Sequence, residues 1–182
     1  TEVTLPGWQL LHYPHILGGP VTHHEAGEDW IRIAGTLAYD GRIGPNALAA
    51  FLRDAELPAL DWSRIGGQFV ALVHKAGRTF LFTDFFAGFQ LHHDRDQRVF
   101  STSLLAAAKA LPRVTFDAQG VYEYAFNVVP IGDDTVFAEL RTLGPERVLE
   151  LTPDRVVAHD APKPLPAAPV AMPLAERIAR HR

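Results

Sequence analysis

Apolar residues occur along this chain in short runs that are separated by glycines, prolines and charged residues. The two densest runs span residues 68–74 and 79–84, with the tetrad Lys-Ala-Gly-Arg at 75–78 between them. A short link that contains glycine, placed between β-branched and aromatic runs, predicts a β-hairpin. Because both runs are apolar at nearly every position, we expect these strands to be covered on both faces and to lie centrally in a stacked-sheet core.

The same stretch continues with two more predicted strands and a helix. Residues 89–93 and 98–102 flank a charged turn, and Ser103 precedes the helix-forming run 104–109. Serine is a favoured residue for the N-cap of a helix. Residues 65–109 are therefore predicted to form one central meander of strands that leads into a helix.

The flanking segments add further strands and an amphipathic helix that is predicted to begin at Pro45, since proline is accepted in a first helical turn. Apolar residues then recur at the spacing of one helix face, which predicts a side that packs inward. These residues are Leu48, Phe51, Leu52 and Ala55. The polar segment 23–29 is predicted to be a solvated loop. Strands are predicted at residues 8–13, 30–37, 147–151 and 155–159.

A second helix is predicted to begin after Asp117, which is a favoured N-cap residue. Phe116 and Val121 have the spacing of a hydrophobic staple. Val121, Tyr124 and Ala125 share one face of this helix, so we expect that face to pack against the domain.

The composition is that of an ordinary folded domain. The chain has 182 residues, of which 47% are hydrophobic and 21% are charged, and its formal net charge is −4. This charge gives no reason to expect nucleic acid or an anionic membrane as a partner. No apolar run approaches the length of a membrane span, and the first residues lack the layout of a signal peptide, so we expect a cytoplasmic protein. The absence of cysteine excludes disulfides, thiolate metal sites and thiol nucleophiles.

The composition changes near residue 160. Residues 161–173 contain five prolines in thirteen positions, which predicts a semi-rigid linker. Residues 174–182 have the pattern of the start of a helix that belongs to a following domain. We therefore expect a compact domain at 1–160, a linker at 161–173 and the first residues of another unit at 174–182.

The order of several small motifs carries a family resemblance. Gly67 and Phe69 in one strand, Asp84 at the end of the next and Gly88 in the following loop come first, and the later motifs are Phe100-Ser101, Ser103, 120–124, 134–137 and 143–145. This order resembles the N-terminal amidotransferase-like domain of the asparagine synthetase family, which is of the class II glutamine amidotransferase type. The resemblance implies an α+β fold, namely an αββα sandwich of two stacked, mainly antiparallel sheets, as in N-terminal-nucleophile (Ntn) hydrolases.

The resemblance also locates a glutamine pocket, which this chain has in altered form. The family's glutaminase reaction uses an N-terminal cysteine and an Asn-Gly pair that stabilises the oxyanion. This chain has no cysteine, and Ala34, Gly35 and Thr36 stand where the Asn-Gly strand is expected. Asp84 and Gly88 match the pocket's Asp-containing turn without its arginines. We therefore predict vestigial pocket positions at Ala34, Gly35, Thr36, Asp84 and Gly88, and no catalytic residue.

Cysteine-less members of this family include β-lactam synthetases and lasso-peptide cyclases, which form amides with ATP. The resemblance implies a non-catalytic domain that scaffolds a synthetase domain or helps to hold its substrate, a peptide or small molecule. No cofactor is expected in this domain, and ATP and Mg²⁺ are expected only in a downstream synthetase domain. The expected partners are this synthetase domain, as part of the same chain or as a separate subunit, and a second copy in a homodimer.

Two alternatives to this function remain open. Thr1 is a candidate nucleophile for a free-standing amide hydrolase, because N-terminal threonine serves this role in other Ntn hydrolases. The third hypothesis is a stand-alone binding module.

The histidines and phenylalanines of the chain are the remaining candidates for a site. Adjacent histidines such as His92 and His93 point to opposite faces of a strand and do not easily reach one metal ion, so no metal site is predicted. Phe80 and Phe82 are predicted to lie in the core. A further group could either anchor loops or form an apolar patch for a neighbouring domain or peptide. This group is Phe85, Phe86 and Phe89.

Overall fold

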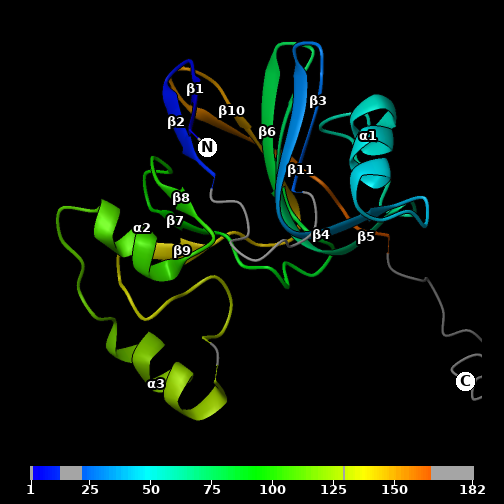
Figure 1. The fold of residues 1–182 in the computed structure, drawn as a ribbon. Helices are drawn as coiled ribbons and strands as arrows, with labels where there is room; N and C mark the ends of the chain where they lie inside the picture. Colours follow the sequence, from blue (N-terminus) through cyan, green and yellow to red (C-terminus); the bar gives the residue numbers. More distant parts are fainter. Residues whose placement is uncertain (1, 13–21, 129, 165–182) are drawn as a thin grey trace, which may run out of the picture.

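The computed structural model of the protein describes residues 2–12, 22–128 and 130–164. Within these ranges it has an α+β fold with three helices and mainly antiparallel sheets (Figure 1), which confirms the predicted class. The largest sheet has six strands in the order β11-β10-β6-β5-β4-β3. Its strands are β3 (His23–Ala26), β4 (Asp29–Tyr39), β5 (Ile65–Lys75), β6 (Arg78–Thr83), β10 (Arg147–Leu151) and β11 (Val156–Asp160).

The predicted hairpin forms the centre of this sheet. Lys75 at the end of β5 pairs with Arg78 at the start of β6. Ala76 and Gly77 between them both have positive φ, of 51° and 73°. A two-residue link with this backbone matches the twist of the two strands. Since β4 and β10 pair with the outer edges of the hairpin, its predicted central position is confirmed.

One face of the six-stranded sheet is covered by helix α1 (Pro45–Asp54) (Figure 1). Leu48 and Phe51 of this helix are fully buried, and the ring of Phe51 meets that of Tyr39 edge-on at 5.4 Å. The predicted inward face of the helix is therefore confirmed, as is the placing of Phe80 and Phe82 in the core. The sheet residues buried in this cluster include Ile31, Ile33, Phe69, Ala71, Val73, Phe80 and Phe82.

The opposite face of the sheet is also apolar, so the prediction that the central strands are covered on both sides is confirmed. Short segments supply this cover: the hairpin of β1 (Glu2–Leu5) and β2 (Trp8–Leu11), the loop after β6, and a three-stranded sheet of order β8-β7-β9. The buried residues of this second cluster are Val70, Leu72, Leu81, Leu91, Leu143 and Leu149.

The prediction of one continuous meander over residues 65–109 is wrong. Strand β7 (His92–Asp94) pairs with β8 (Phe100–Ser101) and β9 (Leu140–Thr142), and these three strands form a separate sheet. The chain has to leave the large sheet after β6 because β10 already pairs with the free edge of that strand. The turn between β7 and β8 has the predicted position, and Asp94 accepts hydrogen bonds there from the backbone N–H groups of Arg98 and Val99.

The polar segment predicted to be a loop contains an edge strand. Residues of β3 pair with β4, so that His23 lies opposite Arg32 and His24 opposite Ile31. Glu25 accepts a hydrogen bond from Arg32 at 2.6 Å. Charged and polar residues are common on edge strands, which are half solvated, and they hide the alternating pattern that identifies a strand.

Two more helices follow strands β7 and β8 along the chain. Helix α2 (Leu104–Ala110) begins after Ser103, whose hydroxyl accepts a hydrogen bond from the N–H of Ala106. Helix α3 (Ala118–Asn127) begins after Asp117, whose carboxylate accepts a hydrogen bond from the N–H of Gly120 at 2.9 Å. Both predicted N-caps are confirmed.

The predicted packing of α3 is wrong. Val121 and Tyr124, assigned to its inward face, are 40% and 55% exposed, and Ala125 is exposed as well. Phe116 stacks on Phe137 with ring centroids 5.3 Å apart, in place of the expected staple with Val121. Apolar residues do recur at helical spacing here, but within the described residues no neighbouring element covers this helix.

Residues 161–164 continue from β11, and Ala161 is buried with its N–H bonded to the carbonyl of Glu146. The other positions of the predicted linker, 165–173, and the predicted helix start at 174–182 lie outside the described residues. No helix in the described ranges is long and apolar enough to cross a membrane.

Candidate functional site

The positions predicted to be vestiges of a glutamine pocket come together where β4, β5 and the end of β6 meet. Gly35 of β4 lies opposite Phe69 of β5. The N–H of Phe69 in turn donates a hydrogen bond to the carboxylate of Asp84, directly after β6. Gly88 lies in the loop that folds over this carboxylate. Residues that are far apart in the sequence thus form one cluster, which we call the Asp84 cluster: Ala34, Gly35, Thr36, Phe69, Asp84, Gly88 and Phe89.

Asp84 is the organising residue of the cluster. Its side chain is buried, and each carboxylate oxygen accepts two backbone N–H groups. Oδ1 accepts from Phe86 and Gly88, each at 3.0 Å, and Oδ2 accepts from Phe69 at 3.2 Å and from Phe89 at 2.8 Å. A carboxylate offers about four lone-pair positions to donors. Asp84 is therefore fully used in fixing the loop and has no acceptor left for a ligand.

Gly35 occupies a place that no other residue fills without strain. Its φ is +94°, and a Cβ atom built on it would lie 2.2 Å from the carbonyl oxygen of Gln68 and 2.9 Å from the ring of Phe89. The space beside Gly35 is thus already taken by backbone and by an aromatic ring. Neighbouring Ala34 carries only a methyl group, so the side chain has no donor for an oxyanion.

Lys163, which follows the last strand β11, contacts the Asp84 cluster. Its ammonium group donates hydrogen bonds to the carbonyl oxygens of Asp84 at 2.7 Å and Phe85 at 2.6 Å. It also lies over the rings of Trp62, at 4.1 Å, and Phe85, at 5.2 Å. Burial lowers the pKa of Lys163 to about 8, against the opposing effects of the Asp84 and Glu146 carboxylates. The segment that follows β11 is therefore hydrogen-bonded to the loop that begins at Asp84.

Sequence reasoning missed Lys163 and also missed Gln68. A lone lysine among prolines carries no pattern that assigns it to a distant aromatic pair. Gln68 lies beside Gly88, and its amide nitrogen would be 3.3 Å from a Cβ atom at that glycine.

The sequence left open whether Phe85, Phe86 and Phe89 anchor loops or form an apolar patch, and the structure divides them. Phe85 and Phe89 pack against the two core clusters, whereas Phe86 is 80% exposed.

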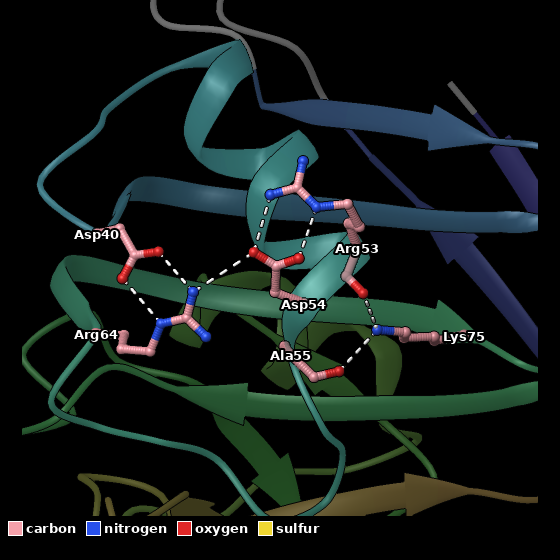
Figure 2. Close-up of polar contacts among 6 residues, drawn as sticks. All are labelled: Asp40, Arg53, Asp54, Ala55, Arg64 and Lys75. Atoms are coloured by element: carbon pink, nitrogen blue, oxygen red, sulfur yellow. Dashed lines mark hydrogen bonds and ion pairs between the residues drawn. The ribbon is translucent and has the colours of Figure 1, made fainter.

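A second group of polar contacts fixes the end of α1 to the sheet (Figure 2). Arg64 forms a two-point ion pair with Asp40 and also contacts Asp54, which Arg53 pairs with as well. Lys75 of β5 donates hydrogen bonds to the carbonyl oxygens of Arg53 at 3.0 Å and Ala55 at 2.7 Å. Free carbonyls at a helix C-terminus accept such bonds readily. These residues hold the helix in place and bring no unused reactive group together.

A surface hollow of about 310 Å³ lies over the outer side of α1. Its lining residues come from this helix and the turn before it: Arg42, Asn46, Ala49, Ala50 and Arg53. None of them belongs to the Asp84 cluster. Arg53 is already paired with Asp54. The hollow is open and holds no convergent set of groups for chemistry.

The other candidate sites from the sequence involve Thr1 and the histidines. Thr1 lies outside the described residues. His92 is buried, which lowers its pKa, while His93 is half-buried and hydrogen-bonded to the carbonyl oxygen of Asp94. Among the described residues, no three histidine, cysteine, aspartate or glutamate side chains lie together in the manner of a metal site.

Comparison of the sequence with models of known protein families and with curated proteins gives no match. The resemblance to amidotransferase-like domains therefore rests on the order of the motifs.

Proposed function

We propose that this chain is a non-catalytic amidotransferase-like domain of an asparagine-synthetase-like protein that forms amides with ATP. Its role is to scaffold the synthetase domain or to help hold its substrate. The observation that carries this proposal is the Asp84 cluster. Five positions that the family resemblance marks as pocket residues lie where β4, β5 and the loop after β6 meet. The Asp84 carboxylate is committed to backbone hydrogen bonds, Gly35 and Gly88 have no side chain, Ala34 has only a methyl group, and Thr36 is exposed.

The absence of glutaminase chemistry follows from the residues. There is no cysteine to act as nucleophile. Ala34 cannot donate to an oxyanion, and loss of one such donor alone costs about 100-fold or more in rate. With Phe89 against Gly35 and all lone pairs of Asp84 occupied, the former pocket is a packed part of the fold.

The proposal includes the architecture of the family. In it, the six-stranded sheet is one layer of an αββα sandwich, α1 covers its outer face, and the smaller sheets belong to the second layer. The apolar side chains on both faces of the central strands support this arrangement.

In this proposal ATP and Mg²⁺ are bound by the synthetase domain. Mg²⁺ is usually held by carboxylates together with nucleotide phosphates. The described residues offer no cluster of carboxylates for it. This domain would accordingly contribute support and contact surface, and no step of amide formation is assigned to its side chains.

The test begins with the natural, untagged protein isolated from its own cells. We expect a mass well above 20.1 kDa, the mass of this chain. We also expect the isolated protein to form an amide from a carboxylate and an amine only when ATP and Mg²⁺ are added, and to release no ammonia from glutamine. A mass of 20.1 kDa with no associated synthetase subunit would contradict the proposal. Amide hydrolysis that is lost in Thr1→Ala would then favour the hydrolase alternative, and its absence the binding module.

A further inference from the structure

The ammonium group of Lys163 is held by partners that carry no charge. It donates hydrogen bonds to the carbonyl oxygens of Asp84 and Phe85, and it lies over the rings of Trp62 and Phe85. Among the described residues it forms no ion pair. Aromatic ring faces attract ammonium groups, and proteins use them to recognise cationic ligands. We call these two carbonyl oxygens and two rings the ammonium site.

The ammonium site is fixed by parts of the fold that do not involve Lys163. Asp84 holds the loop through the four hydrogen bonds of its carboxylate, and its carbonyl oxygen accepts the N–H of Ala87 at 3.1 Å. A carbonyl oxygen has two lone pairs, so this one can accept from an ammonium group as well. The ring of Phe85 meets that of Trp62 edge-on at 5.9 Å. The site is therefore formed by contacts of its own.

Trp62 contributes the face of its ring to the site. The residue is 6% exposed, and its indole N–H is buried without a hydrogen-bond partner among the described residues. Buried tryptophan N–H groups usually find a partner, and leaving one unpaired is unfavourable. A tryptophan at this place is explained by its ring, since tryptophan gives the strongest cation–π contact of the aromatic side chains.

Lys163 reaches the site from a short segment that has one other anchor. The N–H of buried Ala161 is bonded to the carbonyl oxygen of Glu146, whereas Pro162 and Pro164 are exposed. Because the partners of the ammonium group are neutral, its departure leaves no unpaired charge on them. Breaking a buried ion pair, in contrast, strands a charge. The site can therefore exchange one ammonium group for another.

We propose that the ammonium site binds primary alkylammonium groups, and that Lys163 is its tethered occupant, which the end of a lysine side chain from another molecule can replace. The ligand class follows from the occupant: an ammonium group has three donors, of which the two carbonyl oxygens take two. Replacement releases residues 161–164 from the Asp84 loop. This inference goes beyond the proposed function and does not depend on it, because every group of the site belongs to the described residues.

The test uses the 182-residue chain with Lys163→Ala, which empties the site. The probe is n-propylammonium, which has the Cγ, Cδ, Cε and Nζ atoms that this variant lacks. We expect it to shift the backbone N–H signals of Ala87 and Gly88 to saturation in NMR spectra, whereas n-propanol leaves them unchanged. In the wild type, saturation should need at least about tenfold more n-propylammonium, because a tethered group competes at a high effective concentration.

Two double variants test the lining of the site. Lys163→Ala/Phe85→Leu loses one ring face, so we expect n-propylammonium to bind about two- to fivefold more weakly than to Lys163→Ala. The matched control is Lys163→Ala/Phe86→Leu. Phe86 contacts the ring of Phe85 but is 80% exposed, and its substitution should leave the affinity unchanged. The dispersion of each NMR spectrum shows whether the variant is folded, which separates loss of binding from loss of folding.

The small probes decide the inference even if Phe85→Leu prevents folding. No saturating shift in Lys163→Ala would show that the site does not take a free ammonium group, and equal shifts with n-propanol would show that the probe only fills space. Isopropylammonium carries its nitrogen on a branched carbon, as a peptide N-terminus does, and tighter binding of it would contradict a lysine side chain as the ligand. A wild type that does not respond at about a hundredfold the dissociation constant of the variant would make Lys163 a permanent structural contact.

Discussion

Asp84 shows how a single residue can fix a loop that the rest of the site depends on. Its buried carboxylate gathers four backbone N–H groups from β5 and from the loop that leaves β6. An amide side chain has one acceptor oxygen, and its NH₂ group would face N–H donors. We expect Asp84→Asn to lower the free energy of unfolding by about 2 to 3 kcal/mol, because buried donors lose their acceptor.

Urea denaturation of the variant and of Asp96→Asn measures this cost. Asp96 is exposed in the turn between β7 and β8, so its substitution should change stability by less than about 0.5 kcal/mol. Equal stabilities of the two variants would show that the four hydrogen bonds of Asp84 contribute little.

Glu150 on β10 is the residue for which the structure predicts a pH effect. Hydrogen bonding to Arg78, together with a contact to His159, lowers the pKa of Glu150 to about 2. A carboxyl group whose pKa is lower in the folded state stabilises the protein above its unfolded pKa, and this contribution disappears as the pH falls through the folded pKa. Arg78 is 47% exposed, so solvent reduces the contribution to about 1 kcal/mol.

We therefore expect Glu150→Gln to be less stable than the wild type at pH 7 by this amount, with the difference disappearing between about pH 4.5 and pH 2. Denaturation curves at several pH values measure the difference. A difference that stays constant down to pH 2 would assign the effect of Glu150 to packing.

At the scale of elements, the attachment of α3 depends on the lack of a side chain at Gly120. The helix touches the carbonyl oxygen of Thr135 at this residue, and a methyl group would overlap it. Alanine is the better helix former by about 1 kcal/mol, so helix propensity alone predicts that Gly120→Ala is stabilising. Because the backbone contact is rigid, we expect the opposite, a loss of about 2 kcal/mol.

Gly66→Ala is the matched control, since a Cβ atom on Gly66 meets only the Cβ of Ala38 at an ordinary 3.8 Å. Thermal unfolding of the two variants compares them. A stabilised Gly120→Ala variant would mean that α3 moves freely relative to residues 134–137.

At the scale of the whole molecule, Lys163 connects the last described residues of the chain to the Asp84 cluster. This residue fastens the segment after β11 to the loop organised by Asp84. The segment leads toward the residues that we assign to a linker and a following unit. The loop organised by Asp84 thus contributes to the position of residues 161–164 after β11.

The sequence by itself determined the local elements of this protein. Its patterns predicted the β5-β6 hairpin, the inward face of α1 and the N-caps Ser103 and Asp117, and the structure confirms them. These features depend on residues a few positions apart, so the spacing of apolar and capping residues is sufficient to identify them. The α+β class, which the family resemblance implied, is confirmed as well.

Only the tertiary structure decided how these elements combine. Strand β7 joins a second sheet because β10, about 65 positions after β6, pairs with the edge that β7 would otherwise use. Contacts between distant residues likewise bring Gly35, Asp84 and Lys163 together. Helix α3 is exposed because no distant segment among the described residues packs against it. Local periodicity shows that a face is apolar, but what covers that face is set by long-range packing.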